Sequence, residues 1–215
     1  MKIAQLTVGA LEENCYLVVD ETTNRGVLID PGDEPQRIID VVRQSGTTLD
    51  AIWLTHAHFD HVGGIAGVVR EYPVPVYMHP LEEPVLAVAV DAGLRYGVRV
   101  EAPPAADVAL EEGDRLAIGS LEFEVLHVPG HAPGHVAFVG HGGVFGGDCL
   151  FAGSVGTTDI EFGDREALDA SLRRLTALGD ELTVLPGHGP LTTIGHERDT
   201  NPFLIGAARL VRVKR

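Results

Sequence analysis

Residues 55–61 have the sequence Thr55-His56-Ala57-His58-Phe59-Asp60-His61. It places four metal-binding side chains within six residues, directly after the apolar run of residues 51–54. Spacings of i, i+2, i+4 and i+5 cannot put all four groups on one face of a helix, so we expect a loop that leaves a buried strand. Imidazole together with carboxylate favours zinc, iron or manganese over calcium or magnesium. The stretch therefore predicts a metal site.

The alternative for this stretch is a set of packed or solvent-exposed histidines. A single histidine on an apolar segment is usually one of these. Here, however, three histidines and an aspartate occur together, and Gly63-Gly64 and several regularly spaced apolar residues follow them. Neither a hydrophobic core nor a solvated face explains that combination, so the metal site is the preferred interpretation.

Length and composition indicate one globular domain over residues 1–215. The chain can bury a substantial core, and it contains no long polar linker. The N-terminal residues lack the pattern of a signal peptide, and no apolar stretch approaches the roughly 20 residues of a membrane span. Cys15 and Cys149 are too few for a disulfide scaffold and suit a reducing compartment. We expect a cytoplasmic protein without a membrane partner and make no prediction of its oligomeric state.

The charge of the chain argues against nucleic acid as a partner. The formal net charge is -15, and Lys2 and Lys214 are the only lysines. Phosphate backbones are bound through clustered lysine and arginine. We interpret the short basic tail, residues 212–215, as a solvated chain end rather than a contact patch.

The pattern of apolar residues predicts alternating strands and helices in two halves. Strands are expected at residues 2–8, 15–20, 26–30, 51–54 and 74–78, and again through 107–128, 136–140, 143–147 and 181–185. Helices are expected after Asp33 as N-cap, over about 62–71 and 81–96, and after Asp164 as N-cap. Strands in both halves with helices outside suggest two packed sheets between helices.

Other potential ligands follow strand ends in turns rich in glycine and proline. They are His131 and His135 in PGHAPGH (129–135), Asp148 in GGD (146–148) and His188 in PGHGP (186–190). In each case a strand delivers a ligand into a turn whose backbone can aim the side chain at a shared centre. Four ligands on one loop rarely complete a catalytic site, so we expect these residues to complete it.

In this order, THAHFDH, PGHAPGH, GGD and PGHG resemble the metallo-β-lactamase superfamily, in particular its short glyoxalase II-like (hydroxyacylglutathione hydrolase-like) branch. LIDPG (28–32), FAGSVGTTD (151–159) and NPFL (201–204) add to the resemblance. It covers almost the whole chain, without the C-terminal helical domain of full-length glyoxalase II. It implies an α/β fold, an αββα four-layer sandwich in which helices flank two mixed β-sheets, with a two-metal site at one edge.

The resemblance also implies roles for individual residues, carried over by motif. The first metal ion would be bound by His56, His58 and His131, the second by Asp60, His61 and His188, with Asp148 bridging them. Asp30 and His135 are expected in the second shell, where they orient ligands or line the site. Asp60, which would hold a bridging hydroxide, and His135 are the candidate catalytic residues. The order of the motifs suggests a substrate pocket bordered by Phe59, Phe151, Thr157, Asn201 and Phe203.

The implied activity is hydrolysis of a thioester such as S-lactoylglutathione by a metal-bridging hydroxide. The implied cofactors are two divalent ions, zinc first, with iron or manganese open. Two divalent ions, less two carboxylates and one hydroxide, leave about +1 at the centre, which favours a small anionic or strongly polarised substrate. The chain departs from full-length glyoxalase II in the basic groups that would bind glutathione, because it has no lysine between its ends and carries Thr157 where related short proteins often have arginine.

Other activities remain open at this stage. The chain could hydrolyse another thioester or an ester. A mononuclear iron persulfide dioxygenase resembles the same scaffold and would use two histidines with Asp148. A β-lactamase proper would be expected to carry a secretion signal and often a cysteine ligand. A tRNA-processing nuclease conflicts with the acidic charge of the chain. A metal-binding module without turnover would not require the full set of seven ligands.

Overall fold

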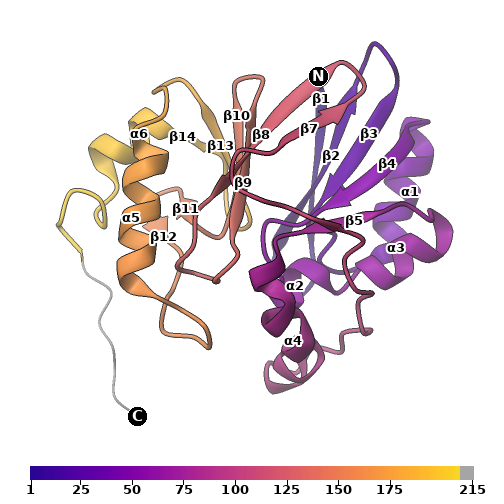
Figure 1. The fold of residues 1–215 in the computed structure, drawn as a ribbon, viewed down its shortest axis with the longest axis horizontal. Coiled ribbons are helices and arrows are strands. Elements are labelled where there is room, and N and C mark those ends of the chain that lie inside the picture. Colours follow the sequence, from indigo (N-terminus) through magenta and orange to yellow (C-terminus); the bar gives the residue numbers. More distant parts are fainter. Residues whose placement is uncertain (209–215) are drawn as a thin grey trace.

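Two six-stranded sheets pack face to face, and helices cover the outer face of each (Figure 1). The structure is a computed structural model that describes residues 1–208. Its four layers confirm the predicted αββα sandwich. The basic tail at 212–215, expected to be solvated, lies outside the described residues. None of the helices within residues 1–208 is long and apolar enough to cross a membrane.

The N-terminal half of the chain forms the first sheet, in the order β1-β2-β3-β4-β5-β6. Its strands are β1 (Lys2–Val8), β2 (Glu13–Asp20), β3 (Arg25–Ile29), β4 (Thr48–Trp53), β5 (Val76–Met78) and β6 (Val108–Ala109). The first three pair antiparallel, and β3 to β6 pair parallel. The helices of this half are α1 (Pro35–Ser45), α2 (Phe59–Val62), α3 (Ile65–Glu71), the short 3-10 helix η1 (Pro80–Glu82) and α4 (Glu83–Arg95).

The C-terminal half forms the second sheet, in the order β14-β13-β10-β9-β8-β7. Its strands are β7 (Arg115–Ile118), β8 (Leu121–His127), β9 (Val136–Gly140), β10 (Gly143–Gly147), β13 (Thr183–Pro186) and β14 (Thr192–Thr193). A separate hairpin pairs β11 (Leu150–Phe151) with β12 (Ser154–Val155). The helices are α5 (Arg165–Thr176) and α6 (Ile194–Thr200). Only β10 and β13 pair parallel among these strands of residues 1–208.

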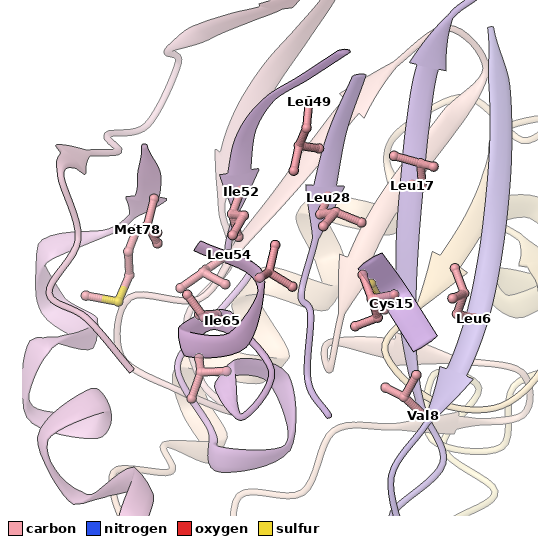
Figure 2. Packing of buried hydrophobic residues seen from close by; sticks show 14 of the residues in the cluster. Leu6, Val8, Cys15, Leu17, Leu28, Leu49, Ile52, Leu54, Ile65 and Met78 are labelled. Atoms are coloured by element: carbon pink, nitrogen blue, oxygen red, sulfur yellow. The ribbon is translucent and has the colours of Figure 1, made fainter. Parts of the chain in front are cut away.

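Strand periodicity divides the core into layers. On β2, Cys15, Leu17 and Val19 pack toward the helices of the first half, whereas Tyr16 and Val18 pack between the sheets. Figure 2 shows the first of these clusters, with Leu17 beside side chains from the neighbouring strands. A third cluster lies between the second sheet and helices α5 and α6. Because successive side chains point to opposite faces, one fully buried strand can serve two layers.

Trp53 fastens the two sheets to each other. Its ring lies 5.7 Å from that of Phe123 and 5.2 Å from that of Phe138, measured between centroids. All three side chains are buried. Since β4 leads directly into the histidine-rich stretch, this packing anchors the strand from which that stretch departs.

Two predicted helix boundaries are wrong. Glu34, not Asp33, is the N-cap of α1, and it has a left-handed backbone with φ 48°. The Asp33 side chain accepts a hydrogen bond from the Glu34 N–H at 2.6 Å and therefore caps no helical turn. The helix expected over about 62–71 is α3, which begins only at Ile65, because the Gly64 N–H donates to Pro31 at 2.9 Å instead of continuing a helix from α2.

Other local predictions are confirmed. The side chain of Asp164 accepts a hydrogen bond from Ala167 and caps α5 as expected. The strands expected at 136–140 and 143–147 are β9 and β10, which pair as a hairpin around His141 with Gly140 opposite Gly143. Both features depend on contacts within a few residues, which is why local sequence predicts them.

Candidate metal centre

The polar side chains of the site gather where several strands end at one edge of the sandwich. The parallel pair β3 and β4 delivers Asp30 and the first ligand loop (residues 54–61) to this edge. The parallel pair β10 and β13 delivers Asp148 and His188. The second ligand loop (residues 129–135) follows β8. Carboxyl ends of parallel strands lie at the same edge, so ligands far apart in sequence meet there.

The first ligand loop is irregular up to His58 and then forms the single helical turn of α2. His58 is therefore in an extended conformation with ψ 150°, whereas Asp60 and His61 lie on the turn. This change of conformation directs the side chains of the loop toward two different groups.

The first group contains His56, His58 and His131. Each offers one nitrogen, and these three atoms lie within 4.8 Å of one another. Nδ1 of His58 lies 2.9 Å from Nε2 of His131. Burial lowers the pKa of all three rings, to about 3 for His58. Neutral imidazoles keep the lone pair that a metal ion requires.

The second group contains Asp60, His61 and His188, whose ligand atoms also lie within 4.8 Å of one another. Nε2 of His188 is 3.3 Å from the Asp60 carboxylate. Asp148 faces both groups: its oxygens lie 3.5 Å from Nε2 of His131, His61 and His188. Although burial opposes ionisation, the neighbouring His61 and His131 hold the pKa of Asp148 well below its usual value. A carboxylate in this position can serve either group.

The donor set fits a pair of metal ions. Nε2 of His56, Nε2 of His61 and Oδ1 of Asp148 are buried without a hydrogen-bond partner among residues 1–208. Buried polar atoms are normally bonded, so three unpartnered atoms on neighbouring side chains require an explanation. Metal coordination supplies it, and the histidine and aspartate donors suit zinc, iron or manganese.

Asp30 supports the first ligand loop. Its carboxylate accepts hydrogen bonds from the Thr55 N–H at 2.8 Å and the Thr55 hydroxyl at 2.6 Å, and it lies 3.0 Å from Nδ1 of His61. This contact orients the His61 ring so that Nε2 faces the second group. Asp30 itself adopts a left-handed backbone with φ 49°.

His135 faces the first group without joining it. Its Nε2 accepts a hydrogen bond from the Asp148 backbone N–H at 3.0 Å, and burial lowers the pKa of the ring well below its usual value. The ring therefore positions the Asp148 backbone.

Sequence reasoning missed two polar residues at the start of β2. Glu13 is buried, with one carboxylate oxygen 3.8 Å from Nδ1 of His61. The Asn14 side chain donates to the carbonyl oxygens of Pro186 at 3.1 Å and Gly189 at 2.9 Å and so braces the turn that carries His188. Their only signal in the sequence is that two polar residues precede a continuous apolar strand.

A cavity of about 1280 Å³ opens directly onto the two groups. One wall is α4, which contributes Val85, Val88, Ala89 and Ala92, and another is the segment 157–163. Arg95 and Arg165 also line the cavity. A cavity with an apolar wall and polar groups at its floor suits a small molecule.

The predicted pocket residues divide into two sets. Phe59 and Thr157 line the cavity, but Phe151, Asn201 and Phe203 are not among its lining residues. The Asn201 side chain is buried and donates to the carbonyl oxygens of Phe151 and Ser154, while Phe203 packs against the cluster around α5. The Asn201 side chain thus bonds to the β11–β12 hairpin. Proximity in motif order did not reveal this contact.

The same residues match a known protein family. Residues 8–188 match the model described as the metallo-β-lactamase superfamily. The chain belongs to the metallo-β-lactamase superfamily. The matched residues run from the end of β1 to His188, so they include both ligand loops, Asp148 and most strands of the two sheets that position them.

Curated relatives match over nearly the whole chain. "Probable metallo-hydrolase YqgX" of Bacillus subtilis is 38% identical over 96% of this chain and 99% of its own length. "Hydroxyacylglutathione hydrolase GloC" of Haemophilus influenzae is 36% identical over 95% of this chain and 98% of its own length. As a member of this superfamily with a histidine and aspartate cluster, the chain is a metal-binding hydrolase.

Solved structures share the fold and differ in what they are called. TTHA1623 in a di-iron-bound form is 49% identical, with a TM-score of 0.88 over 94% of this chain and 100% of the other. The B3 metallo-β-lactamase BLEG-1 is 37% identical, with a TM-score of 0.89 over 94% and 99%. ETHE1 from Myxococcus xanthus is 29% identical, with a TM-score of 0.81 over 96% and 85%.

Proposed function

We propose that this protein is a binuclear metallohydrolase that cleaves a small anionic thioester of the S-lactoylglutathione type. The observation that carries the proposal is the position of Asp148 between two groups of three ligands, 3.5 Å from a nitrogen on each side. A single ion would be bound by only one of the two groups, and the buried polar atoms of the other group would remain without a partner. The similarity to a hydroxyacylglutathione hydrolase supports the choice of substrate.

The residues of the chain divide the work between holding ions and binding substrate. His56, His58 and His131 would hold one ion, and the second group, with Asp148 shared, would hold the other. When bound, two divalent ions lower the pKa of water near neutrality and stabilise negative charge on a carbonyl oxygen. Zinc is our first choice, and the di-iron form of TTHA1623 supports testing iron as well.

Side chains of the cavity position the thioester. The apolar wall of α4 can hold the uncharged part of a substrate against the floor on which Asp60 and His188 lie. Arg165 lines the cavity with a side chain that is 38% exposed, and its Nε pairs with Asp169 at 2.9 Å. A partly exposed guanidinium at the cavity wall suits an anionic substituent.

The protein does not need a cysteine nucleophile for this reaction. Cys149 follows Asp148 directly, yet its side chain is buried, and burial raises the pKa of the thiol far above its usual value. A thiol of that kind stays protonated and unreactive. Cys15 and Cys149 are both free, which suits the reducing cytoplasm that we propose as the location of the protein.

A second candidate rests on a subset of the same ligands. His58, His131 and Asp148 alone form a set of two histidines and one carboxylate, the ligand type of mononuclear iron oxygenases. A mononuclear iron persulfide dioxygenase is therefore the alternative.

Metal analysis combined with turnover tests the proposal. Protein purified without added metal is analysed for metal per chain, and the same sample is assayed with S-lactoylglutathione, other thioesters, an ester and a β-lactam. About two ions with efficient thioester cleavage would support the proposal. One iron with oxygen consumption would favour the dioxygenase. Two ions with turnover of the β-lactam alone would replace the thioester by a different substrate.

A further inference from the structure

The carboxylate of Glu82 joins the two ligand loops without belonging to either ligand group. Its Oε2 accepts a hydrogen bond from the backbone N–H of Ala57 at 2.7 Å. Its Oε1 accepts one from the backbone N–H of Gly134 at 2.6 Å. Ala57 lies between two histidines of the first loop, and Gly134 precedes His135 in the second. One side chain thus spans backbones that are otherwise distant in sequence.

Glu82 is wholly buried, and it has no ion-pair partner among residues 1–208. Burial raises its pKa to about 7, while the two backbone N–H groups act in the opposite direction. Placing a carboxylate in such an interior is costly unless hydrogen bonds compensate. Two short bonds to backbone donors provide that compensation, and loop residues would otherwise have to bury two unpaired N–H groups.

The same residue connects both loops to the cavity wall. Glu82 is the last residue of η1 and the N-cap of α4. The next turns of α4 carry Val85 and Ala89, which line the cavity. A negative side chain at a helix N-terminus is also favourable for the helix. Glu82 therefore lies where both histidine loops and α4 meet.

We propose that Glu82 is a positioning residue that holds the two ligand loops at the separation required to bind metal. The inference rests on the proposed function only in that it requires metal to bind at this site. A movement of one loop relative to the other would affect the first ligand group most, because Nδ1 of His58 and Nε2 of His131 approach to 2.9 Å across the two loops. A relative shift of the loops by about 1 Å would alter this group directly.

Glu82→Gln tests this role with almost no change in shape. An amide has one acceptor oxygen, and its NH₂ group would face the N–H of the other loop, so one of the two bonds is lost. Glu83→Gln is the matched control, because Glu83 is the adjacent, exposed glutamate at the same helix end. Val42→Ala is a second control that removes buried packing on α1 and lowers stability away from the site.

The readout is Zn²⁺ affinity, measured by chelator competition with the metal-free full-length variants, together with their Tm. We expect Glu82→Gln to weaken Zn²⁺ binding about 10- to 100-fold, the range found when groups that orient metal ligands are replaced. Glu83→Gln should bind like the wild type, and Val42→Ala should lose Tm with wild-type affinity. Wild-type affinity in Glu82→Gln, or a loss no larger than in Val42→Ala, would overturn the inference.

A measurement on the wild-type protein covers the case in which Glu82→Gln does not fold. In the metal-free protein, the amide protons of Ala57 and Gly134 should exchange slowly with solvent, as expected for buried bonds to a carboxylate. Exchange as fast as that of the exposed hairpin residue Gly142 would contradict the proposed role of Glu82. If Zn²⁺ affinity falls in Glu82→Gln but no thioester is cleaved by the wild type, the proposed function fails and the role of Glu82 stands.

Discussion

Nδ1 of His58 lies 2.9 Å from Nε2 of His131, although the two residues are 73 positions apart in the chain. Each ring is buried, and burial lowers the pKa of both. Two neutral imidazoles that face each other in this way suit a shared metal ion.

Substitution of His131 should remove metal from the first group. We expect His131→Ala to bind about one ion fewer per chain than the wild type and to lose most of the rise in Tm that added Zn²⁺ produces. Metal analysis and thermal unfolding with and without Zn²⁺ measure this. His196→Ala is the control, because His196 is exposed and lies outside both groups. Equal metal content in the two variants would count against the assignment of His131.

Asp30→Asn should weaken metal binding through His61. Asparagine tolerates the left-handed backbone of this position, so the change mainly removes charge and an acceptor from the contacts to Thr55 and His61. We expect Zn²⁺ affinity to fall about 10- to 100-fold. Asp50→Asn, which alters a surface pair with Arg25, should leave the affinity unchanged. A similar effect of both substitutions on affinity would rule out a specific role for Asp30.

Gly187→Ala should distort the floor of the site. A Cβ atom at Gly187 would lie 2.2 Å from Oδ1 of Asp148 and 2.7 Å from a ring carbon of His61. Relief of such a clash costs about 1–3 kcal/mol in a packed interior. We expect lower stability and loss of metal from the second group. Gly179→Ala, whose Cβ would meet nothing closer than 3.9 Å, is the control, and a normal metal content in Gly187→Ala would refute the prediction.

Arg165→Gln should weaken substrate binding rather than chemistry. A hydrogen bond between Arg165 and an anionic group contributes equally before and in the transition state, so its loss raises KM about 10-fold and leaves kcat unchanged. Steady-state kinetics with an anionic and an uncharged thioester measure this, and only the anionic one should be affected. Arg173→Gln on the exposed side of α5 is the control. An equal rise in KM for both thioesters would show that Arg165 does not distinguish an anionic from an uncharged substrate.

Acid should weaken the contact between Asp20, at the end of β2 in the first sheet, and Ser120, in the turn between β7 and β8 of the second sheet. The Asp20 carboxylate accepts hydrogen bonds from the backbone of Ser120 and Thr22, and from the Thr23 hydroxyl, and these bonds hold its pKa far below the usual value. A carboxyl with a lowered pKa stabilises the folded state above its unfolded pKa, near ~3.9, and loses this contribution as the pH falls toward the folded value.

Asp20→Asn should therefore lower Tm at pH 7, and the gap to the wild type should narrow as the pH falls below about 4. Thermal unfolding of both proteins in chelator, across pH 3–7, tests this without interference from metal loss. A difference in Tm that stays constant over that range would show that the ionised carboxylate of Asp20 does not stabilise the contact with Ser120.

Much of the fold can be read from the chain because it depends on local periodicity. The apolar run at residues 15–19 predicts the strand β2, and Asp164 marks the start of α5 through a bond to Ala167. The break between α2 and α3 could not be predicted, because the Gly64 N–H is taken by Pro31, a partner outside the helix. The path of Asn201 was equally hidden, since its side chain bonds to residues of the β11–β12 hairpin.

The chemical types of the ligands and their order follow from the sequence, because each ligand stands in a short motif after a strand. Which ligands meet, the bonds of Glu82 to both loops and the position of α4 at the cavity wall follow only from the folded arrangement. The physical reason is that these relationships depend on the pairing of β3 with β4, on that of β10 with β13, and on the packing of one sheet against the other. No short stretch of sequence contains both partners of such a contact.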